Sequence, residues 1–362
     1  MKDQYLKKIL NARVYDVAIQ SPLHVAERLS ARLGNTLWLK REDQQQIFCY
    51  KLRGAYNKMK TLSREQLNRG VVAASAGNHA QGVALAACKL GCRAVIFMPV
   101  TTPAIKKEAV ENLGGIVKLV GESYSDTGHA AHEYCEGEDM TYIPPFDDPD
   151  VIAGQGTVAA EIIRQSEHSL DALFIPVGGG GLIAGMATFI KAVRPDIRII
   201  GVEPADSCAM AQSIAAGERL TLDDVGIFAD GVAVKQVGEE TFRLCQKYVD
   251  EFVLVSTDEL CAAIKDIYED TRSIMEPAGA LGVAGIKKWI RQQQEQGDAP
   301  RGRHFACVLS GANMNFDRLR HVSERAEIGE GRENIFAVVI PEQPGSFQQL
   351  LLTIGDVSIT EF

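Results

Sequence analysis

Seven short apolar runs, separated by segments with helical periodicity, constrain the fold of this chain more than any other feature. Most of the runs are continuously apolar, which is typical of strands covered on both faces, as in a parallel sheet. Between the runs, apolar residues such as Leu52, Ala55 and Met59 fall on one helical face. The alternation predicts an α/β fold. The expected strands are Val71–Ala74, Ala94–Met98, Ile116–Val120, Leu173–Val177, Ile197–Val202, Phe252–Val255 and Phe305–Leu309.

The composition is that of a globular chain. Its 362 residues, 46% of them apolar and 23% charged, suffice for a substantial core in one large domain or two. The formal charge of -9 offers no basic stripe for a nucleic acid or an anionic membrane surface. Eight cysteines without a Cys-x-x-Cys pair indicate reduced and mostly buried thiols.

Two uncharged stretches, 70–88 and 172–190, have about the length of a membrane span. Polar side chains, Asn78 among them, interrupt the first, and Pro176 with four glycines interrupts the second, so we expect neither to cross a membrane. The N-terminal residues mix acid and base without an apolar core, which leaves no visible secretory signal. We therefore expect a cytoplasmic protein.

A charged, glycine-rich segment from Glu324 to Asn334 indicates a linker between a main unit, 1–325, and a tail, 326–362. In the tail we expect a strand, a helix and a second strand, which are too few elements to bury a stable core. The chain is therefore expected to end inside a domain or to borrow the rest from a partner. The three elements are predicted at Ile335–Ile340, Gly345–Leu352 and Val357–Phe362.

The strongest local signal is a run of four glycines, Gly178–Gly181, between the expected strand Leu173–Val177 and a helical segment from Ile183. Glycines there let backbone N–H groups approach an anion at the positive end of a helix, which suits a phosphate. A tight turn without a ligand is the simpler alternative. A dinucleotide site is another, but its Gly-x-Gly-x-x-Gly spacing is met only loosely, since position 183 is not a glycine.

Two other turns carry polar or reactive groups at a helix start. Ser75, Gly77 and Asn78 offer donors to a carboxylate or a phenolic oxygen, although serine and asparagine are also ordinary helix caps. Lys51 follows an apolar and aromatic stretch, where its amine would have a lowered pKa and favour Schiff-base chemistry. The alternative is that this lysine, like most, only solvates a helix face.

Ser310 begins a fourth turn at the end of an apolar strand, and taken alone it is an ordinary strand-to-helix turn. The four turns together indicate a binding site more specifically than any one of them does alone. We expect Lys51, Asn78, Gly178–Gly181 and Ser310 to converge at the carboxyl edge of one parallel sheet, where α/β proteins bind their ligands.

No metal site is predicted. His129 and His132 share a helix face by their spacing but have no further ligands spaced to complete a site, so we expect both at the surface. Glu203 and Asp206 could touch a monovalent cation, a role that we do not assign to them.

Seven short motifs, in this order, resemble the biosynthetic threonine dehydratases, or threonine deaminases, of the fold-type II pyridoxal-phosphate family. The similarity spans nearly the whole chain. It implies a tryptophan synthase β-like fold with two open parallel-sheet subdomains, of which the smaller, about 42–150, is inserted in the larger. The motifs are Lys51–Ala55, Ser75–Gly82, Pro144–Asp147, Ala153–Thr157, Gly178–Gly181, Glu276–Ala280 and Ser310–Asn313.

The resemblance implies an enzyme that converts L-threonine to 2-oxobutanoate and ammonia, the first step of isoleucine biosynthesis, and that also acts on L-serine. It implies pyridoxal 5'-phosphate as cofactor and a homo-oligomer, either a dimer or a tetramer. A serine racemase or a β-replacing synthase on the same scaffold is the alternative enzyme. A catalytically silent binder of an amino acid or a nucleotide is an alternative of another class.

The resemblance also implies a role for each site residue. Lys51 holds the cofactor covalently and, once released, is the base for the α-proton. Ser310 faces the pyridine nitrogen, and because its hydroxyl is neutral, the ring is a weaker electron sink, which favours elimination over transamination. The residues implied at the cofactor are Lys51, Tyr50, Asn78 at the ring hydroxyl, Gly178, Gly179, Gly180, Gly181 and Leu182 at the phosphate, and Ser310; those at the substrate are Ser75, Gly77, Asn78 and His79, the last as an orienting residue rather than a base.

The lysine motif departs from the family, because Cys49-Tyr50-Lys51 stands where Ser-Phe-Lys is usual. Tyr50 still has a ring to pack beside the cofactor. Cys49 replaces a hydroxyl near the reacting centre, a change that bears on substrate preference and rate.

The tail resembles the first half of an ACT-like regulatory domain, with 341–347 as its strand-to-helix loop. In the family such domains bind isoleucine as inhibitor and valine as its antagonist. Because only part of an effector site is expected here, we predict an active enzyme with weak or absent feedback inhibition.

Overall fold

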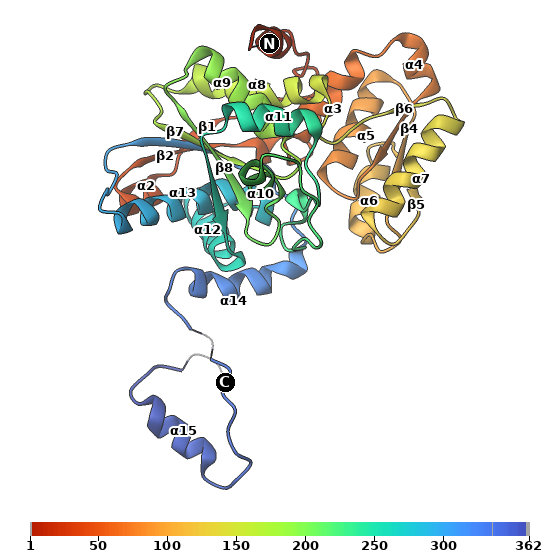
Figure 1. Cartoon of the computed structure of the whole chain (residues 1–362). Coiled ribbons are helices and arrows are strands. Elements are labelled where there is room, and N and C mark those ends of the chain that lie inside the picture. The colour runs from red at the N-terminus through yellow and green to blue at the C-terminus, as the bar shows by residue number, and fades with distance from the viewer. Residues whose placement is uncertain (1, 335, 360–362) are drawn as a thin grey trace.

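The chain forms two lobes, each built on its own sheet, in a computed structural model that describes residues 2–334 and 336–359. Figure 1 shows the larger lobe at the left, the smaller lobe at the right and the last helix below both. The smaller sheet uses only residues between 71 and 142, whereas strands of the larger sheet precede and follow it. The chain therefore leaves the larger lobe once and returns to it.

The larger sheet has six strands in the order β1-β2-β10-β7-β8-β9, and the smaller has four in the order β5-β4-β3-β6. All neighbouring pairs are parallel except β1 and β2 at one edge. The strands are β1 Leu23–Val25, β2 Thr36–Lys40, β3 Val71–Ala74, β4 Ala94–Met98, β5 Ile116–Leu119, β6 Thr141–Tyr142, β7 Ala172–Pro176, β8 Arg198–Pro204, β9 Glu251–Val255 and β10 His304–Val308.

The predicted α/β fold with two parallel-sheet subdomains is confirmed, and each of the seven predicted strands forms within two residues of its expected ends. The sequence analysis missed β1, β2 and β6. The first and last of these are too short to give a pattern, with three and two residues. β2 ends on Lys40, a charged residue that is fully buried in the structure and that hid the strand in the sequence.

The helices cover both faces of each sheet, which explains why the strands are apolar throughout. In β7, Leu173 and Ile175 join the core cluster on one face of the larger sheet, and Phe174 joins the cluster on the other. The helices are α1 Lys2–Leu10, α2 Glu27–Leu33, α3 Lys51–Lys60, α4 Arg64–Arg69, α5 Asn78–Leu90, α6 Ala104–Glu111, α7 Tyr124–Gly137, α8 Pro149–Gln165, α9 Gly181–Val193, α10 Ala209–Ala216, α11 Glu239–Tyr248, α12 Thr257–Thr271, α13 Pro277–Glu295, α14 Leu319–Gly329 and α15 Ser346–Ile354, with 3-10 turns η1 Glu42–Gln44, η2 Asp230–Val232 and η3 Phe316–Arg318.

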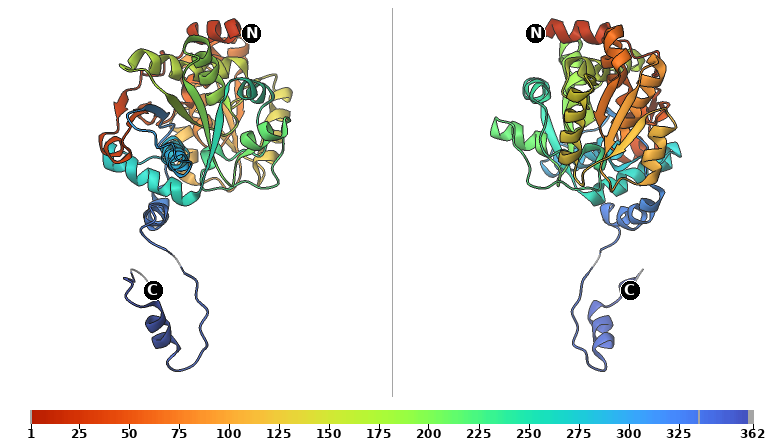
Figure 2. Two further views of the ribbon diagram at one scale, coloured as in Figure 1. Left: turned by 60° about the vertical axis from the view of Figure 1, so that its left-hand side comes forward. Right: turned by 90° about the vertical axis from the view of Figure 1, so that its right-hand side faces the viewer.

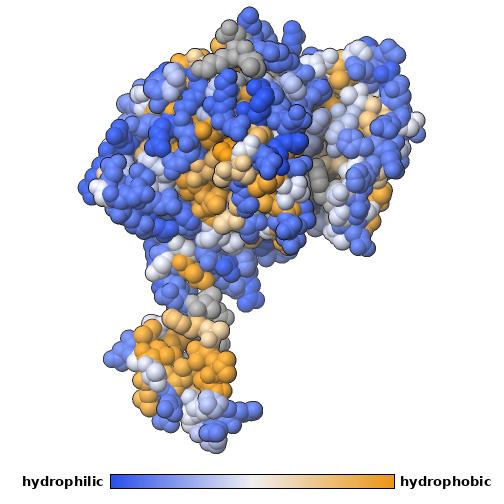
Figure 3. Space-filling view, in the orientation of Figure 1, coloured by the Kyte–Doolittle hydropathy of each residue, from blue (hydrophilic) through white to orange (hydrophobic). Residues whose placement is uncertain are grey.

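The tail differs from its prediction. The helix forms as α15, but residues 336–340 and 357–359 are not strands, and the predicted residues 335 and 360–362 lie outside the described part. A strand needs a neighbour for its backbone hydrogen bonds, and the views of Figures 1 and 2 show the tail apart from both sheets. Figure 3 shows its apolar side chains gathered at the surface, and Val339 is 99% exposed.

The predicted linker also begins later than expected, because Glu324–Gly329 continue helix α14. Val322 and Ala326 are buried on the face of α14 that packs against α12, and Arg325 forms an ion pair with Asp258. This amphipathic face stabilises the helix despite the charged residues between its apolar positions.

Three smaller expectations can be compared with the structure. All eight cysteines are unpaired and six are buried, as predicted. His129 and His132 are both exposed on α7, also as predicted. Within residues 2–334 and 336–359, no helix is both long and apolar enough to cross a membrane.

Candidate active site

The glycine run Gly178–Gly181 forms the turn between β7 and α9, as the sequence predicted. Gly180 has φ +95°, a backbone conformation that a side chain would strain. A Cβ on Gly179 would lie 2.2 Å from the ring of Phe146, so the turn has no room for one. The first turn of α9, which includes Leu182, carries no acidic side chain, and its N-terminus therefore favours an anion.

Side chains from two other segments fix this glycine turn. Thr241 at the start of α11 donates from Oγ1 to the carbonyl oxygen of Gly179 at 2.7 Å. The start of α11 is held in turn by Asp147, whose carboxylate accepts from the backbone N–H groups of Glu239 and Thr241. The motif Pro144–Asp147 thus braces the turn through both Phe146 and Asp147.

Lys51 is the first residue of α3, where the chain arrives through a strained turn. Phe48 has φ +54°, in the left-handed region that bulky residues avoid. Helix α5 approaches closely because Gly82 has no side chain, and a Cβ there would lie 3.2 Å from the carbonyl oxygen of Lys51. Burial lowers the pKa of the Lys51 amine, and the charges of Glu276 and Asp230 only partly oppose that shift.

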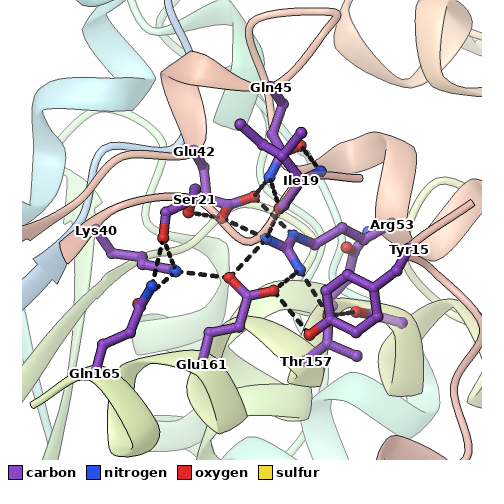
Figure 4. A network of polar contacts seen from close by, with 12 residues as sticks. Tyr15, Ile19, Ser21, Lys40, Glu42, Gln45, Arg53, Thr157, Glu161 and Gln165 are labelled. Atoms are coloured by element: carbon purple, nitrogen blue, oxygen red, sulfur yellow. Dashed lines mark hydrogen bonds and ion pairs between the residues drawn. The ribbon is translucent and has the colours of Figure 1, made fainter. Parts of the chain in front are cut away.

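Arg53, two residues after Lys51, anchors α3 to the larger lobe through a buried network (Figure 4). Its guanidinium donates to Glu42 of η1 at 2.8 Å and to Glu161 of α8 at 2.6 Å, and all three side chains are fully buried. Lys40 of β2 donates to the other oxygen of Glu161 at 2.6 Å. Two positive and two negative side chains therefore balance inside the protein.

The turn Ser75–His79 links β3 to α5 in the smaller lobe. The backbone N–H of Gly77 donates to Ser75 Oγ at 3.2 Å, so these two predicted substrate donors hydrogen-bond each other here. His79 Nε2 lies 2.8 Å from the carbonyl oxygen of Ile143, which follows β6. Burial and the charge of Lys51 lower the pKa of His79 to about 3, so the imidazole is neutral at physiological pH.

Asn78 is held on both sides of its amide. Its Nδ2 donates to Glu276 at 2.6 Å, and its Oδ1 accepts from Asn313 at 2.6 Å. Ser310 is buried in the turn after β10 that also contains Asn313. Its Oγ donates to the carbonyl oxygen of Ala278 at 3.2 Å. The turn after β10 and the start of α13 thereby meet the smaller lobe at Asn78.

The structure brings the turns of Lys51, Asn78 and Ser310 together through direct contacts, and the glycine turn adjoins them through η2. Cys49 pairs with Gly311 in an isolated β-bridge, and the backbone N–H of Tyr50 donates to the carbonyl oxygen of Ser310. A Cβ on Gly178 would lie 2.9 Å from Val232 of η2. In the same 3-10 turn, a Cβ on Gly231 would lie 4.0 Å from Asn78 Nδ2.

The expectation of one common sheet edge is wrong. Gly178–Gly181 and Ser310 follow β7 and β10 of the larger sheet, whereas Asn78 follows β3 of the smaller one. Lys51 follows no strand directly, because η1 and a loop separate it from β2. The site therefore lies between the two lobes, and each lobe contributes different groups to it.

The sequence analysis gave no role to Glu276, Asn313 or Phe146, which take part in the site through the contacts described above. Glu276 precedes Pro277 at the start of α13, a pattern that indicates an ordinary helix cap. The carboxylate instead forms no cap hydrogen bond and turns toward Asn78. Only the fold reveals that contact, since 198 positions separate the two residues.

Proteins of other organisms are similar in sequence to this chain over nearly its whole length. A protein of Burkholderia multivorans named L-threonine dehydratase biosynthetic is 56% identical over 99% of the chain, which spans 70% of that relative's length. Threonine dehydratase 1 biosynthetic, chloroplastic, of Solanum lycopersicum is 55% identical over 99% of the chain, which spans only 58% of that relative.

Solved structures of other proteins share the fold as well. The processed form of threonine deaminase isoform 2 from Solanum lycopersicum superposes with a TM-score of 0.87 at 51% identity, covering 90% of this chain and 88% of that one. A serine racemase of Dictyostelium discoideum gives 0.78 at 30% identity, covering 86% and 99%. The family model described as pyridoxal-phosphate dependent enzyme matches residues 14–311, a range that contains all four turns up to Gly311. By this match and these identities, the chain belongs to the family of pyridoxal-phosphate dependent enzymes.

Proposed function

We propose that this chain converts L-threonine to 2-oxobutanoate and ammonia and accepts L-serine as a second substrate. The observation that carries the proposal is the 56% identity, over 99% of the chain, to a biosynthetic threonine dehydratase. The alternative, a serine racemase, is supported by the same fold but at only 30–31% identity. The proposal covers the lyase reaction, since the chain spans less than two thirds of some of its relatives.

The residues present fit pyridoxal 5'-phosphate. Gly179 and Gly180 pack so closely on Phe146 and Met210 that a Cβ on either would clash, and they lie next to a helix N-terminus without acidic side chains. Lys51 is half-buried, and its lowered pKa keeps a larger share of the amine neutral and able to react with an aldehyde. A phosphate cradle and a reactive amine are the two features that this cofactor needs most.

In this proposal each turn holds one part of the cofactor. Lys51 would hold it covalently through Nζ, and Gly178–Gly181 with Leu182 would bind its phosphate through backbone N–H groups. Asn78 would bind its ring oxygen, Ser310 would face its ring nitrogen and Tyr50 would pack beside the ring. When bound, the cofactor supplies an aldehyde that captures the substrate amine and a conjugated ring that withdraws electrons from the carbon next to the carboxylate.

The substrate groups would meet the smaller lobe. Ser75, Gly77 and Asn78 line the start of α5, where a helix N-terminus favours a carboxylate. His79 is neutral and bound to Ile143, so its part is to orient this turn rather than to take a proton. Lys51 Nζ, released from the cofactor, would take the proton from the α-carbon of threonine, the role that its lowered pKa supports.

A coupled assay for 2-oxo acids tests the function. Purified protein with added pyridoxal phosphate should form 2-oxobutanoate from L-threonine and pyruvate from L-serine. Lys51→Ala should abolish both products and the visible absorbance of the bound cofactor, whereas Lys60→Ala, which alters an exposed lysine of the same helix, should change neither. D-serine formed from L-serine in place of 2-oxo acids would instead favour the racemase.

Three finer assignments belong to the same proposal. We infer that residues 1–325 form the catalytic unit, with about 42–150 as its smaller subdomain, and that 326–362 begin an ACT-like regulatory unit. The exposed apolar side chains of the tail support this inference, among them Phe336 and Leu352. We propose isoleucine as the effector of such a unit, with valine as its antagonist, and the 2-oxo acid assay with each amino acid added measures the response.

We also propose a cytoplasmic homo-oligomer, a dimer or tetramer. Many large apolar side chains are exposed in the single chain, and Phe316 is 84% exposed. Light scattering coupled to size exclusion would measure the mass of the assembly, and a monomer at micromolar concentration would contradict the proposal. Localisation of a tagged chain in its host would test the compartment.

A further inference from the structure

Glu276 is a buried carboxylate at the active site that no step described so far uses. It is 4% exposed at the N-cap of α13, yet its side chain caps no backbone N–H of that helix. Its Oε1 lies in the space that Gly311 leaves, since a Cβ on that glycine would be 2.3 Å away. Asn78 Nδ2 donates to the same oxygen at 2.6 Å.

This contact restricts what Asn78 can do. Glu276 accepts from Nδ2 of the amide and Asn313 donates to Oδ1, so the two contacts together determine which way the amide faces. An amide nitrogen carries two hydrogens, and the second remains as a donor. Asn78 is thereby presented to a ligand as a hydrogen-bond donor, with Glu276 behind it.

The charge on Glu276 depends on pH near neutrality. Burial and the negative charge of Asp230 raise its pKa to about 7, and Asn78, Lys51 and Lys106 oppose the rise. These charged groups come from η2, α3 and α6, and thus from both lobes.

Two further groups that can ionise lie close to Glu276, in the segment before α3. The charge of Glu276 contributes to raising the pKa of both the Cys49 thiol and the Tyr50 hydroxyl, after burial as the main cause. Both therefore stay neutral across the range in which Glu276 titrates. Of these three groups, only Glu276 therefore changes its charge near neutral pH.

We propose that Glu276 is a positioning residue that acts through Asn78, orienting its amide and coupling its own proton to the charge on the cofactor oxygen that Asn78 binds. The inference rests on the proposed function, because it places the cofactor ring against Asn78. An ionised Glu276 disfavours negative charge on that oxygen in a buried site, and a protonated Glu276 does not. The protonation state of the bound cofactor should therefore follow that of Glu276.

The test is a pH titration of the holoprotein without substrate, followed by the visible absorbance of bound pyridoxal phosphate. Wild type should show an inflection near pH 7, the pKa of Glu276. Glu276→Gln, which keeps the shape and an acceptor for Asn78, should lose this inflection. Asp230→Asn should move it to lower pH, because a neighbouring negative charge is removed.

The matched control is Glu203→Gln. Glu203 is also fully buried with a raised pKa, but it accepts from backbone N–H groups of Met210 and Ala211 at the start of α10. Its loss should leave the inflection in place. Asn78→Ala should remove the inflection, and adding Glu276→Gln to that variant should change nothing further, since the two residues act in series.

The outcomes separate this inference from the proposed function. A wild type that binds the cofactor and turns over threonine, but titrates as Glu276→Gln does, overturns the role of Glu276 alone. An inflection that survives in Asn78→Ala but not in Glu276→Gln overturns the action through Asn78. A protein that binds no cofactor and forms no 2-oxo acid overturns the proposed function, and this inference with it.

Discussion

The Arg53 guanidinium contacts both carboxylate oxygens of Glu161, at 2.6 Å through Nη1 and at 3.0 Å through Nη2. Burial alone would raise the pKa of Glu161, but the hydrogen bonds and charges of Arg53 and Lys40 outweigh it and hold that pKa below its ordinary value. Both members of the pair are fully buried, so their charges depend on each other.

Replacing Arg53 should therefore lower the free energy of unfolding far more than replacing a surface arginine. We expect Arg53→Met to lower the free energy of unfolding by about 3–5 kcal/mol, because Glu42 and Glu161 would be left buried without their partner. Arg194→Ala, which breaks an exposed pair with Asp196, should lower it far less, because water already screens that pair. Urea unfolding of the three proteins measures the difference, and equal losses would contradict the importance of the network.

The part of the site that the sequence predicted is local. Gly178–Gly181 could be recognised because strand, glycines and helix follow one another within a few residues. The role of Arg53 could not, since its partner Glu161 is 108 positions away and an arginine on a helix is usually solvated. Strand β2 was missed for a related reason. A lysine such as Lys40 is usually exposed, and only the fold shows that it pairs with Glu161 in the interior.

Gly180 should be required for cofactor binding rather than for folding. Gly180→Ala would strain the backbone at φ +95° and place a Cβ 2.5 Å from Met210, which should weaken pyridoxal phosphate binding by about tenfold or more. Gly217→Ala is the matched control, since that glycine has φ +78° at the end of α10 with no atom within 4 Å of an added Cβ. It should lose about 1 kcal/mol of stability and bind the cofactor as wild type does.

Fluorescence or absorbance titration with pyridoxal phosphate measures both affinities, and thermal unfolding of the cofactor-free proteins measures stability. If Gly217→Ala weakened cofactor binding as much as Gly180→Ala, the effect would come from general strain and not from the turn after β7.

His79 should make the protein less stable in acid. Its folded pKa of about 3 lies below the ordinary value of 6.5, so the unfolded state binds more protons between these pH values and stability falls as the pH is lowered through them. At pH 4 the loss from this residue should reach about 3 kcal/mol relative to pH 7. His79→Gln keeps a donor for Ile143 and should show a smaller loss.

The matched substitution for comparison is His24→Gln, which replaces an exposed histidine on β1. Denaturant unfolding at several pH values between 4 and 7 measures all three proteins. An identical slope for wild type and His79→Gln would show that the imidazole is not held neutral by the fold.

Glu203 should have the opposite effect to His79 on how stability changes with pH. Burial raises the pKa of its carboxyl to about 8, outweighing the backbone N–H groups of Met210 and Ala211 that favour the charged form. The folded state therefore binds more protons than the unfolded state between pH 4.5 and 8, and stability falls as the pH rises through that window.

Glu203→Gln removes the titrating group and keeps one acceptor for the helix, so its free energy of unfolding should fall less between pH 5 and pH 8 than that of wild type. Glu65→Gln, at an exposed acid of α4, is the matched substitution for comparison. A Glu203→Gln protein whose stability falls as steeply as wild type would mean that this carboxyl is already ionised at pH 5 and that its two backbone donors, not burial, set its charge.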